Sequence, residues 1–176
     1  MLTIGHSTRP IEEFVQVLRA HGVETVVDVR TVPRSRHNPQ FNADALPAVL
    51  GAAGIAYVHM PALGGLRRAR PDSPNSGWRN ASFRGYADYM QTPEFQRAIE
   101  QLVELAGGGR AAVMCAESVP WRCHRSLISD ALAARGLPVE HILDERSRKP
   151  HQVTPFARFE GTRVTYPPEQ PRLEWG

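Results

Sequence analysis

The residues best suited to chemistry lie in one stretch, 110–136, which contains both cysteines of the chain. Cys123 is flanked there by Arg122, His124 and Arg125. A thiol among cationic groups in the first turn of a helix has a lowered pKa, so Cys123 could serve as a nucleophile, a redox centre or a metal ligand. Cys123 and His124 are therefore candidate catalytic residues.

Three further residues of this stretch are candidates for the site. Glu117 lies between the two cysteines, where a carboxylate can act as an acid or base or can pair with an arginine. Cys115 ends an apolar run, which makes it either a small core residue or a second thiol facing the site. Trp121 could stack on a base or cover the loop. Glu117 and Cys115 complete the catalytic candidates.

A strand and a helix are predicted to hold these residues. The apolar run 111–115 predicts a strand, and the spacing of apolar residues over 127–132 predicts a helix that begins at Cys123 and ends at Gly136. The same alternation fills the rest of the chain. Further strands are predicted at 2–4, 25–29, 55–59 and 138–143, and helical segments at 11–22, 46–50, 86–90 and 93–105.

This order predicts an α/β protein with a three-layer Rossmann-like fold. We expect a mostly parallel sheet of about five strands with helices on both faces. At 176 residues the chain suits one domain, over 1–145, followed by a tail, 146–176, with a possible small hairpin packed on the domain. The irregular segment 60–85 is long for a compact domain and is typical of a functional lid or a mobile segment.

Arginine accounts for all basic residues except Lys149. Coding bias can explain this excess, but thirteen of the arginines follow the predicted carboxyl ends of strands, where ligands bind in such sheets. Longer loops could also account for this placement. Because a guanidinium grips phosphate or carboxylate through two bonds, we expect an anion-binding rim. The candidate binding residues are His6, Ser7, Arg30, Arg34, Arg36, Arg122, Arg125 and Trp121.

Several classes of protein and site are disfavoured. The chain has no apolar run long enough for a membrane span and no signal-peptide pattern, so a cytoplasmic protein is expected. It has no G-x-G-x-x-G or P-loop motif, so no dinucleotide cofactor is predicted. His6 and His124 could complete a Cys2His2 metal site, but no C-x2-C pair is present, so a metal is possible and not favoured. The sequence does not indicate an oligomeric state.

Five segments carry a resemblance to a known family. They are TIGHST (3–8), VVDVRTVPRSR (26–36), NPQFN (38–42), FRGYADYM (83–90) and the stretch from MCAE to CHR (114–125). With these segments the chain resembles the DUF488 family, a bacterial and archaeal group of unknown function. The resemblance implies a grouping and no activity. It implies shared positions at Gly5, His6, Ser7, Asp28, Arg30, Cys115, Glu117, Cys123, His124 and Arg125.

The stretch from Cys115 to Ser126 also distantly resembles rhodanese-like and cysteine-phosphatase domains. In those domains a strand ends in a cysteine, and a loop leads to an Arg-Ser helix start. Here nine residues without a glycine separate Cys115 from Arg125, so the loop departs from a tight six-residue anion cradle. The resemblance implies sulfur transfer or phosphatase activity as an alternative, and the departure of the loop weighs against it.

The leading hypothesis is an enzyme or ligand-binding protein with an anion site at the carboxyl edge of the sheet. Its partner would be a phosphate-bearing small molecule, a nucleotide or nucleic acid, and replacing Arg30 and Arg125 by alanine is expected to abolish binding with the fold intact. One alternative is a non-catalytic nucleic-acid-binding module that uses Trp78, Trp121 and Tyr86 as stacking platforms. Another is a thiol-based or metal-dependent enzyme.

Overall fold

The computed structural model describes residues 1–168 and contains a central six-stranded sheet in the order β3-β2-β4-β1-β5-β6. Five strands are parallel, which confirms the predicted fold class. They are β1 (Leu2–Gly5), β2 (Thr25–Asp28), β3 (Ala56–His59), β4 (Ala111–Cys115) and β5 (Glu140–Ile142). The sixth, β6 (Arg148–Pro150), was not predicted and pairs antiparallel with β5 at the edge.

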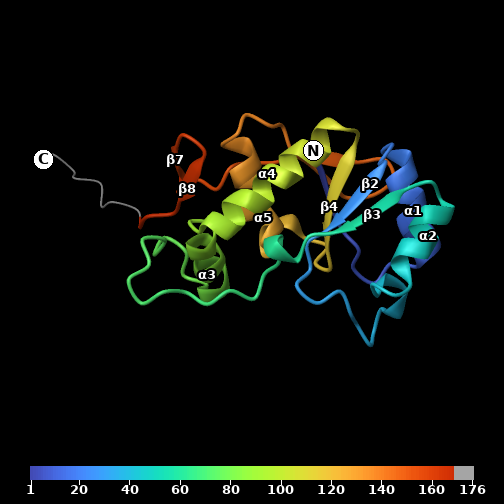
Figure 1. Ribbon diagram of the computed structural model, residues 1–176, viewed down its shortest axis with the longest axis horizontal. Coiled ribbons are helices and arrows are strands. Elements are labelled where there is room, and N and C mark those ends of the chain that lie inside the picture. Colours follow the sequence, from blue (N-terminus) through green and yellow to red (C-terminus); the bar gives the residue numbers. More distant parts are fainter. Residues whose placement is uncertain (169–176) are drawn as a thin grey trace, which may run out of the picture.

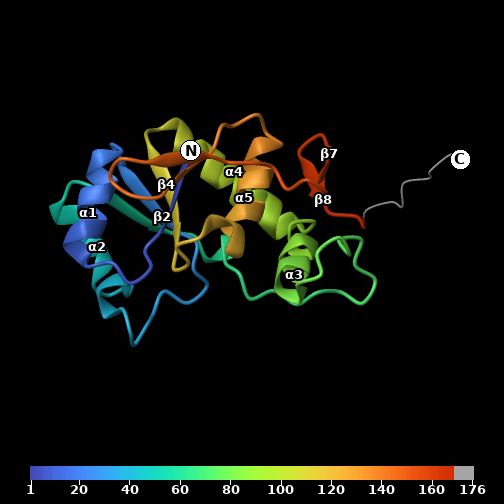
Figure 2. The ribbon, with the colours of Figure 1, turned by 180° about the vertical axis from the view of Figure 1, so that it is seen from behind.

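Helices cover both faces of this sheet (Figure 1, Figure 2). On one face lie α1 (Ile11–Ala20) and α2 (Leu46–Ala52). On the other lie α4 (Pro93–Gly107) and α5 (Arg125–Ala133), and α3 (Ala81–Tyr89) lies beyond these two helices and shares their core. Short 3-10 turns are η1 (Pro39–Phe41), η2 (Pro61–Leu63) and η3 (Pro120–Arg122). Neighbouring strand residues serve opposite cores, since Val26 packs in the α1 core and Val27 in the α4 core, as the pleat requires.

The centre of the sheet has a topological switch point between β1 and β4. The chain leaves β1 towards α1 on one face and leaves β4 towards α5 on the other, so the two loops diverge at the carboxyl edge. Such a point is where open α/β sheets bind their ligands. The backbone N–H groups of His6 and Ser7 bond the carbonyls of Cys115 and Ala116, both at 2.9 Å, which holds the two loops together.

Gly5 allows this close approach of the two loops. A Cβ atom at position 5 would lie 1.9 Å from the carbonyl oxygen of Glu117, far inside any tolerated contact. Only glycine therefore lets the end of β1 lie against the loop after β4. The consequence for the site is that His6 and Cys115 become neighbours.

The predicted start of the helix at Cys123 is wrong. Pro120 begins the turn η3, whose first carbonyl accepts the N–H of Cys123 at 3.2 Å, and Cys123 itself is extended, with φ −131° and ψ 150°. Helix α5 begins at Arg125. Cys123 thus precedes the first helical turn, so its thiol depends on neighbouring side chains more than on a helix terminus.

The segment between η2 and α3 is packed on the domain. Helix α3 begins at Ala81, earlier than the helical turn predicted at 86–90, because the Asn80 side chain accepts the N–H groups of Ser82 and Phe83. Asp88, buried in this helix, accepts hydrogen bonds that anchor the segment. Its donors are the N–H of Arg70, the hydroxyl of Ser73 and the amide of Asn75.

The C-terminal part of the described chain forms a separate hairpin beside α5. Strand β7 (Arg158–Glu160) pairs antiparallel with β8 (Arg163–Thr165). Residues 169–176 of the predicted tail lie outside the described residues. Within residues 1–168, no helix has the length and apolar character that a membrane crossing requires.

Candidate functional site

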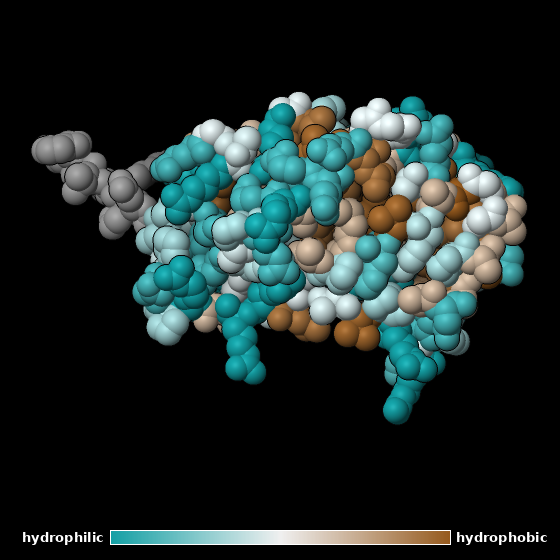
Figure 3. Space-filling view, in the orientation of Figure 1, coloured by the Kyte–Doolittle hydropathy of each residue, from teal (hydrophilic) through white to brown (hydrophobic). Residues whose placement is uncertain are grey.

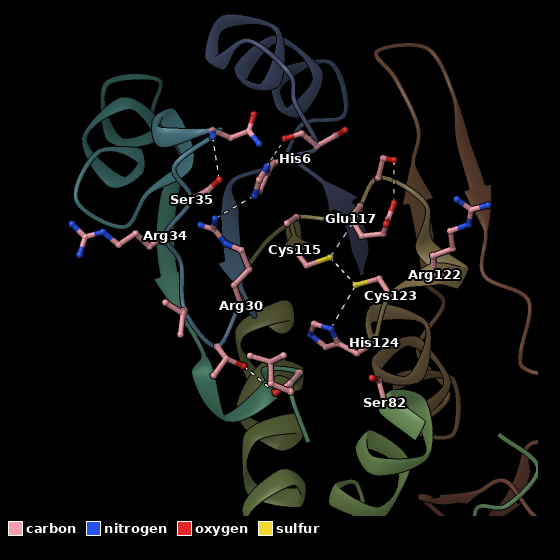
Figure 4. Close-up of a pocket in the computed structure, with 18 of the residues that line it drawn as sticks. His6, Arg30, Arg34, Ser35, Ser82, Cys115, Glu117, Arg122, Cys123 and His124 are labelled. Carbon is pink, nitrogen blue, oxygen red and sulfur yellow. Dashed lines mark hydrogen bonds between the residues drawn. The ribbon is translucent and has the colours of Figure 1, made fainter. Parts of the chain in front are cut away.

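A cavity of about 620 Å³ opens at the carboxyl edge of the sheet (Figure 4). This volume is typical of sites for small molecules. Nine of the twelve predicted site residues line it: His6, Ser7, Arg30, Arg34, Cys115, Glu117, Arg122, Cys123 and His124. The other three, Arg36, Trp121 and Arg125, do not. The structure therefore brings together residues from the loops after β1, β2 and β4.

Two free thiols meet at the base of the cavity. The Sγ atoms of Cys115 and Cys123 lie 2.7 Å apart, close enough for one sulfur to donate a hydrogen bond to the other. Cys115 is 3% exposed and Cys123 is 7% exposed. Cys115 is the last residue of strand β4, and the turn η3 places Cys123 beside it. Cys115 is thus both a core residue and part of the site.

The pKa values of the two thiols are shifted in opposite directions. The pKa of Cys123 is lowered well below its ordinary value, chiefly by a hydrogen bond from the Cys115 thiol and further by His124, whose Nδ1 lies 3.6 Å from its sulfur. Burial raises the pKa of the Cys115 thiol. A hydrogen bond to the charged form favours that form, so the negative charge of the pair is favoured on Cys123.

Arg125 lies beneath the thiols and not at the cavity surface, so its predicted direct contact with a ligand is not available in this structure. It is 1% exposed. Its Nε donates to Cys115 Sγ at 2.9 Å, and its terminal nitrogens donate to Thr3 Oγ1 at 3.2 Å and to the carbonyl of Glu117. Among residues 1–168 no carboxylate forms an ion pair with it.

Arg30 is neutralised within the protein. It bonds Asp28 through two nitrogens, at 2.9 and 2.7 Å, and also donates to the carbonyl of Phe41. Asp28 is buried and accepts a further hydrogen bond from the hydroxyl of Tyr57. The remaining terminal nitrogen of Arg30 lies 3.2 Å from Nε2 of His6. Arg30 thus organises the cavity wall more than it offers a free cation.

His6 is neutral at physiological pH. Burial lowers the pKa of its imidazole to about 4. With Arg30 donating to Nε2, the ring proton is assigned to Nδ1, which bonds the carbonyl of Ser7 at 2.8 Å. The imidazole ring also stacks on the ring of Phe41, with the two ring centroids 4.2 Å apart. Both ring nitrogens are therefore engaged, and His6 acts as a positioning group for Arg30.

The predicted anion rim is reduced to a few arginines. Of the thirteen arginines at this edge, Arg30, Arg34 and Arg122 line the cavity. Arg34 and Arg122 are exposed, and in Figure 4 their side chains extend outwards on opposite sides of the cavity. Trp121 is exposed outside the lining. Positive charge therefore flanks the mouth of the cavity and does not fill it.

Hydrophobic side chains at the cavity were not predicted. Val32 and Leu66 line it while 65% and 88% exposed, together with Phe83 and Tyr86. In the space-filling view, hydrophobic residues reach the surface along the lower edge, near the carboxyl ends of the strands (Figure 3). Leu66 also has a left-handed backbone, φ 60°, directly after two glycines. In the sequence, the position of the apolar Leu66 directly after Gly64 and Gly65 was the feature that could have indicated apolar surface at the cavity.

The hypothetical Cys2His2 metal site finds no support in the geometry. Among residues 1–168, no three His, Cys, Asp or Glu side chains are grouped so that they could hold a metal ion. His6 directs its Nε2 at the guanidinium of Arg30, a cation that would repel a bound metal. The cysteine pair is therefore better described as a thiol site.

A buried polar chain connects the thiol pair with the C-terminal segment. Arg125 bonds Thr3, whose Oγ1 lies 2.7 Å from Nδ1 of His141; His141 Nε2 lies 3.0 Å from His151 Nδ1. His151 Nε2 then lies 2.7 Å from Asp130 Oδ1. Burial lowers the pKa of His141 to about 4, so this ring is neutral.

Comparison with known proteins gives a family but no activity. No curated protein and no solved structure matches the chain. The profile of a family described as "Domain of unknown function DUF488" matches residues 10–132, which is more than half of the chain and includes Cys115, Cys123, His124 and Arg125. The protein therefore belongs to the DUF488 family, whose function is unknown.

Proposed function

We propose that this protein is a thiol-dependent enzyme in which the Cys123 thiolate attacks a small molecule held in the cavity. The observation that carries the proposal is the burial of Arg125 against the thiol pair with no carboxylate partner among residues 1–168. A guanidinium remains charged at all physiological pH values, and a buried charge is costly unless an opposite charge compensates it. A thiolate in the Cys115–Cys123 pair supplies that charge.

The proposed role of Cys123 is that of a covalent nucleophile. A thiolate reacts where a thiol does not, and its neighbours here favour the charged form at the surface of the cavity. His124 and the Cys115 thiol both bond the sulfur and would stabilise it between turnovers. Neutral His6 is committed to Arg30 and is not proposed as the base.

The proposed substrate is a small molecule with an apolar part and an anionic group, such as a phosphate or a carboxylate. Val32 and Leu66 offer apolar surface at the cavity, and Arg34 and Arg122 flank its mouth with positive charge. Arginine binds either anion through its planar fork. Compared with the hypothesis of an anion site, the proposal assigns the reaction to the thiol of Cys123 and the binding of the anionic group to Arg34 and Arg122.

A nucleic-acid-binding module is a weaker candidate. Of the three aromatic residues expected to stack on bases, Tyr86 is 1% exposed and Trp78 packs against Phe83, with ring centroids 4.7 Å apart. Trp121 alone among the three is exposed. One exposed ring gives little stacking surface for a single strand.

The test is the pH dependence of alkylation by iodoacetamide, followed residue by residue by mass spectrometry. We expect Cys123 to react about tenfold faster than free cysteine near pH 7, with an apparent pKa below that of an ordinary thiol. Cys123→Ser should remove the fast reaction, while Ser76→Ala, at an exposed position outside this cavity, should leave it unchanged. If neither thiol reacts faster than free cysteine, the proposal fails.

A further inference from the structure

We infer that Cys115 is a resolving thiol and that the cysteine pair reduces small organic disulfides by cycling between a dithiol and a disulfide. This inference rests on the proposed function, because it takes Cys123 as the attacking thiolate. It adds the class of substrate and a second reacting residue. Three features of the site carry it: the distance between the sulfurs, the position of Arg125, and the form of the cavity.

The distance between the sulfurs is the first feature. The two Sγ atoms lie 2.7 Å apart, so only a small further approach separates them from the length of a disulfide bond, about 2.05 Å. Both sulfurs are largely shielded, and Cys123 faces the cavity with Cys115 beside it. Both residues line the cavity, and because Cys123 is the more exposed of the two, a substrate would reach Cys123 first.

The position of Arg125 is the second feature. For a mechanism with one cysteine, a buried cation would be expected at the nucleophile, yet Nε of Arg125 lies 2.9 Å from the sulfur of Cys115. Once Cys123 has formed a bond to substrate, its negative charge is gone and Arg125 has no compensating charge. A thiolate at Cys115 restores the balance, so Arg125 favours ionisation of Cys115 at the step that needs it.

The chemistry balances with these groups alone. The Cys123 thiolate attacks one sulfur of a substrate R–S–S–R, the substrate S–S bond breaks, and the departing thiolate takes the proton of Cys115. The Cys115 thiolate then attacks Cys123 Sγ, breaks the mixed disulfide and releases the second half as a thiolate. Two electrons pass from the protein sulfurs to the substrate. A small thiol or dithiol reductant then regenerates the pair by the same exchange.

The cavity suits a disulfide with two organic halves. Its volume of about 620 Å³ exceeds what a phosphate or a peroxide alone would need. The apolar residues Val32 and Leu66 can contact carbon substituents on the two sulfurs, and Arg34 and Arg122 favour substituents that carry carboxylates.

The test uses 5,5′-dithiobis(2-nitrobenzoate), a disulfide with two carboxylates whose released thiolate absorbs visible light. The reduced full-length protein is mixed with the reagent near pH 7, released thiolate is counted, and the protein is weighed by intact mass spectrometry. We expect two equivalents of released thiolate, no retained adduct, and the loss of two hydrogens, at a rate about tenfold above that of free cysteine.

Two variants separate this inference from the proposed function. Cys115→Ser keeps an oxygen that can bond Arg125 and Cys123, and it should release one equivalent and retain one adduct on Cys123. Cys123→Ser should lose the fast reaction. If the wild-type protein retains the adduct on Cys123, or forms its internal disulfide no faster with the reagent than by slow air oxidation, the resolving role is overturned while the nucleophile stands.

If Cys123→Ser reacts as fast as the wild-type protein, the proposed function itself is overturned. Circular dichroism of each variant checks that it folds. Should Cys115→Ser fail to fold, the wild-type measurement still decides, because the retained adduct and the internal disulfide differ in mass and in released thiolate.

Discussion

Nε of Arg125 donates a hydrogen bond to Sγ of Cys115 at 2.9 Å, and this contact joins the thiol pair to a buried polar chain. Arg125 also donates a hydrogen bond to Thr3. From Thr3 the hydrogen bonds continue through His141 and His151 to Asp130. Asp130 in turn accepts the hydroxyl of Tyr166, the residue that follows β8. The C-terminal segment is therefore structurally connected to the candidate site.

Arg125→Met should raise the apparent pKa of the cysteine pair, because the cation that favours the thiolate is removed. We expect a shift of about one unit or more, with a loss of roughly 3 kcal/mol in the free energy of unfolding. The thiolate absorbance near 240 nm, titrated with pH, measures the shift. Arg135→Met is the control, since Arg135 pairs with Glu100 away from the thiols. Equal titration curves for Arg125→Met and wild type would contradict this role.

Arg30→Ala should destabilise the fold, because it leaves Asp28 buried without its cation. A loss of about 3–5 kcal/mol is typical of a broken buried ion pair. The expectation from sequence, that Arg30 and Arg125 could be replaced with the fold intact, is therefore reversed by their burial. Urea unfolding measures the effect, with the exposed Arg34→Ala as the control, for which a change within about 0.5 kcal/mol is expected.

Gly5→Ala should disrupt the candidate site, because its new Cβ would collide with the carbonyl of Glu117. That carbonyl also accepts a hydrogen bond from Arg125, so both stability and the reactivity of Cys123 should fall. Gly51→Ala is a matched control, since that helical position has open space and alanine favours a helix by roughly 1 kcal/mol. Thermal unfolding should separate the two, and equal melting temperatures would argue against the close approach.

The stability of the protein should decrease as the pH falls from about 6.5 to about 4. His6 and His141 have pKa values lowered to about 4 by burial, so the unfolded chain binds protons in this window before the folded protein does. At about pH 5, each of these two histidines should lower the free energy of unfolding by roughly 2 kcal/mol relative to its value at neutral pH. Urea unfolding at several pH values tests this, and His141→Gln should show a shallower dependence than wild type.

Asp130→Ala should destabilise the C-terminal segment. Its buried carboxylate accepts hydrogen bonds from His151, Thr154 and Tyr166. The loss of these bonds should lower the free energy of unfolding by about 3 kcal/mol. Limited proteolysis should then cut within 144–168 faster than in the wild-type protein. Asp72→Ala removes an exposed carboxylate and should change neither measurement, since exposed ion pairs contribute little. Similar cleavage of both variants would contradict the anchoring role.

The sequence alone determined the layered fold and the edge of the sheet at which the candidate site lies. Each parallel strand and the helices α1, α2, α4 and α5 were predictable, because apolar periodicity and local features such as the cap at Thr92 act within a few residues. The prediction that loops after these strands carry the site follows from parallel topology, which places all their carboxyl ends together.

Tertiary structure alone decided which polar residues are available to a ligand. Sequence treats Arg30, Arg34 and Arg125 alike, yet Asp28 neutralises the first, solvent surrounds the second and the thiols hold the third. The same holds for the contact between Cys115 and Cys123, which depends on an extended residue after a proline turn. Burial and pairing are set by contacts between distant segments, and these contacts fix the charge and reactivity of each group.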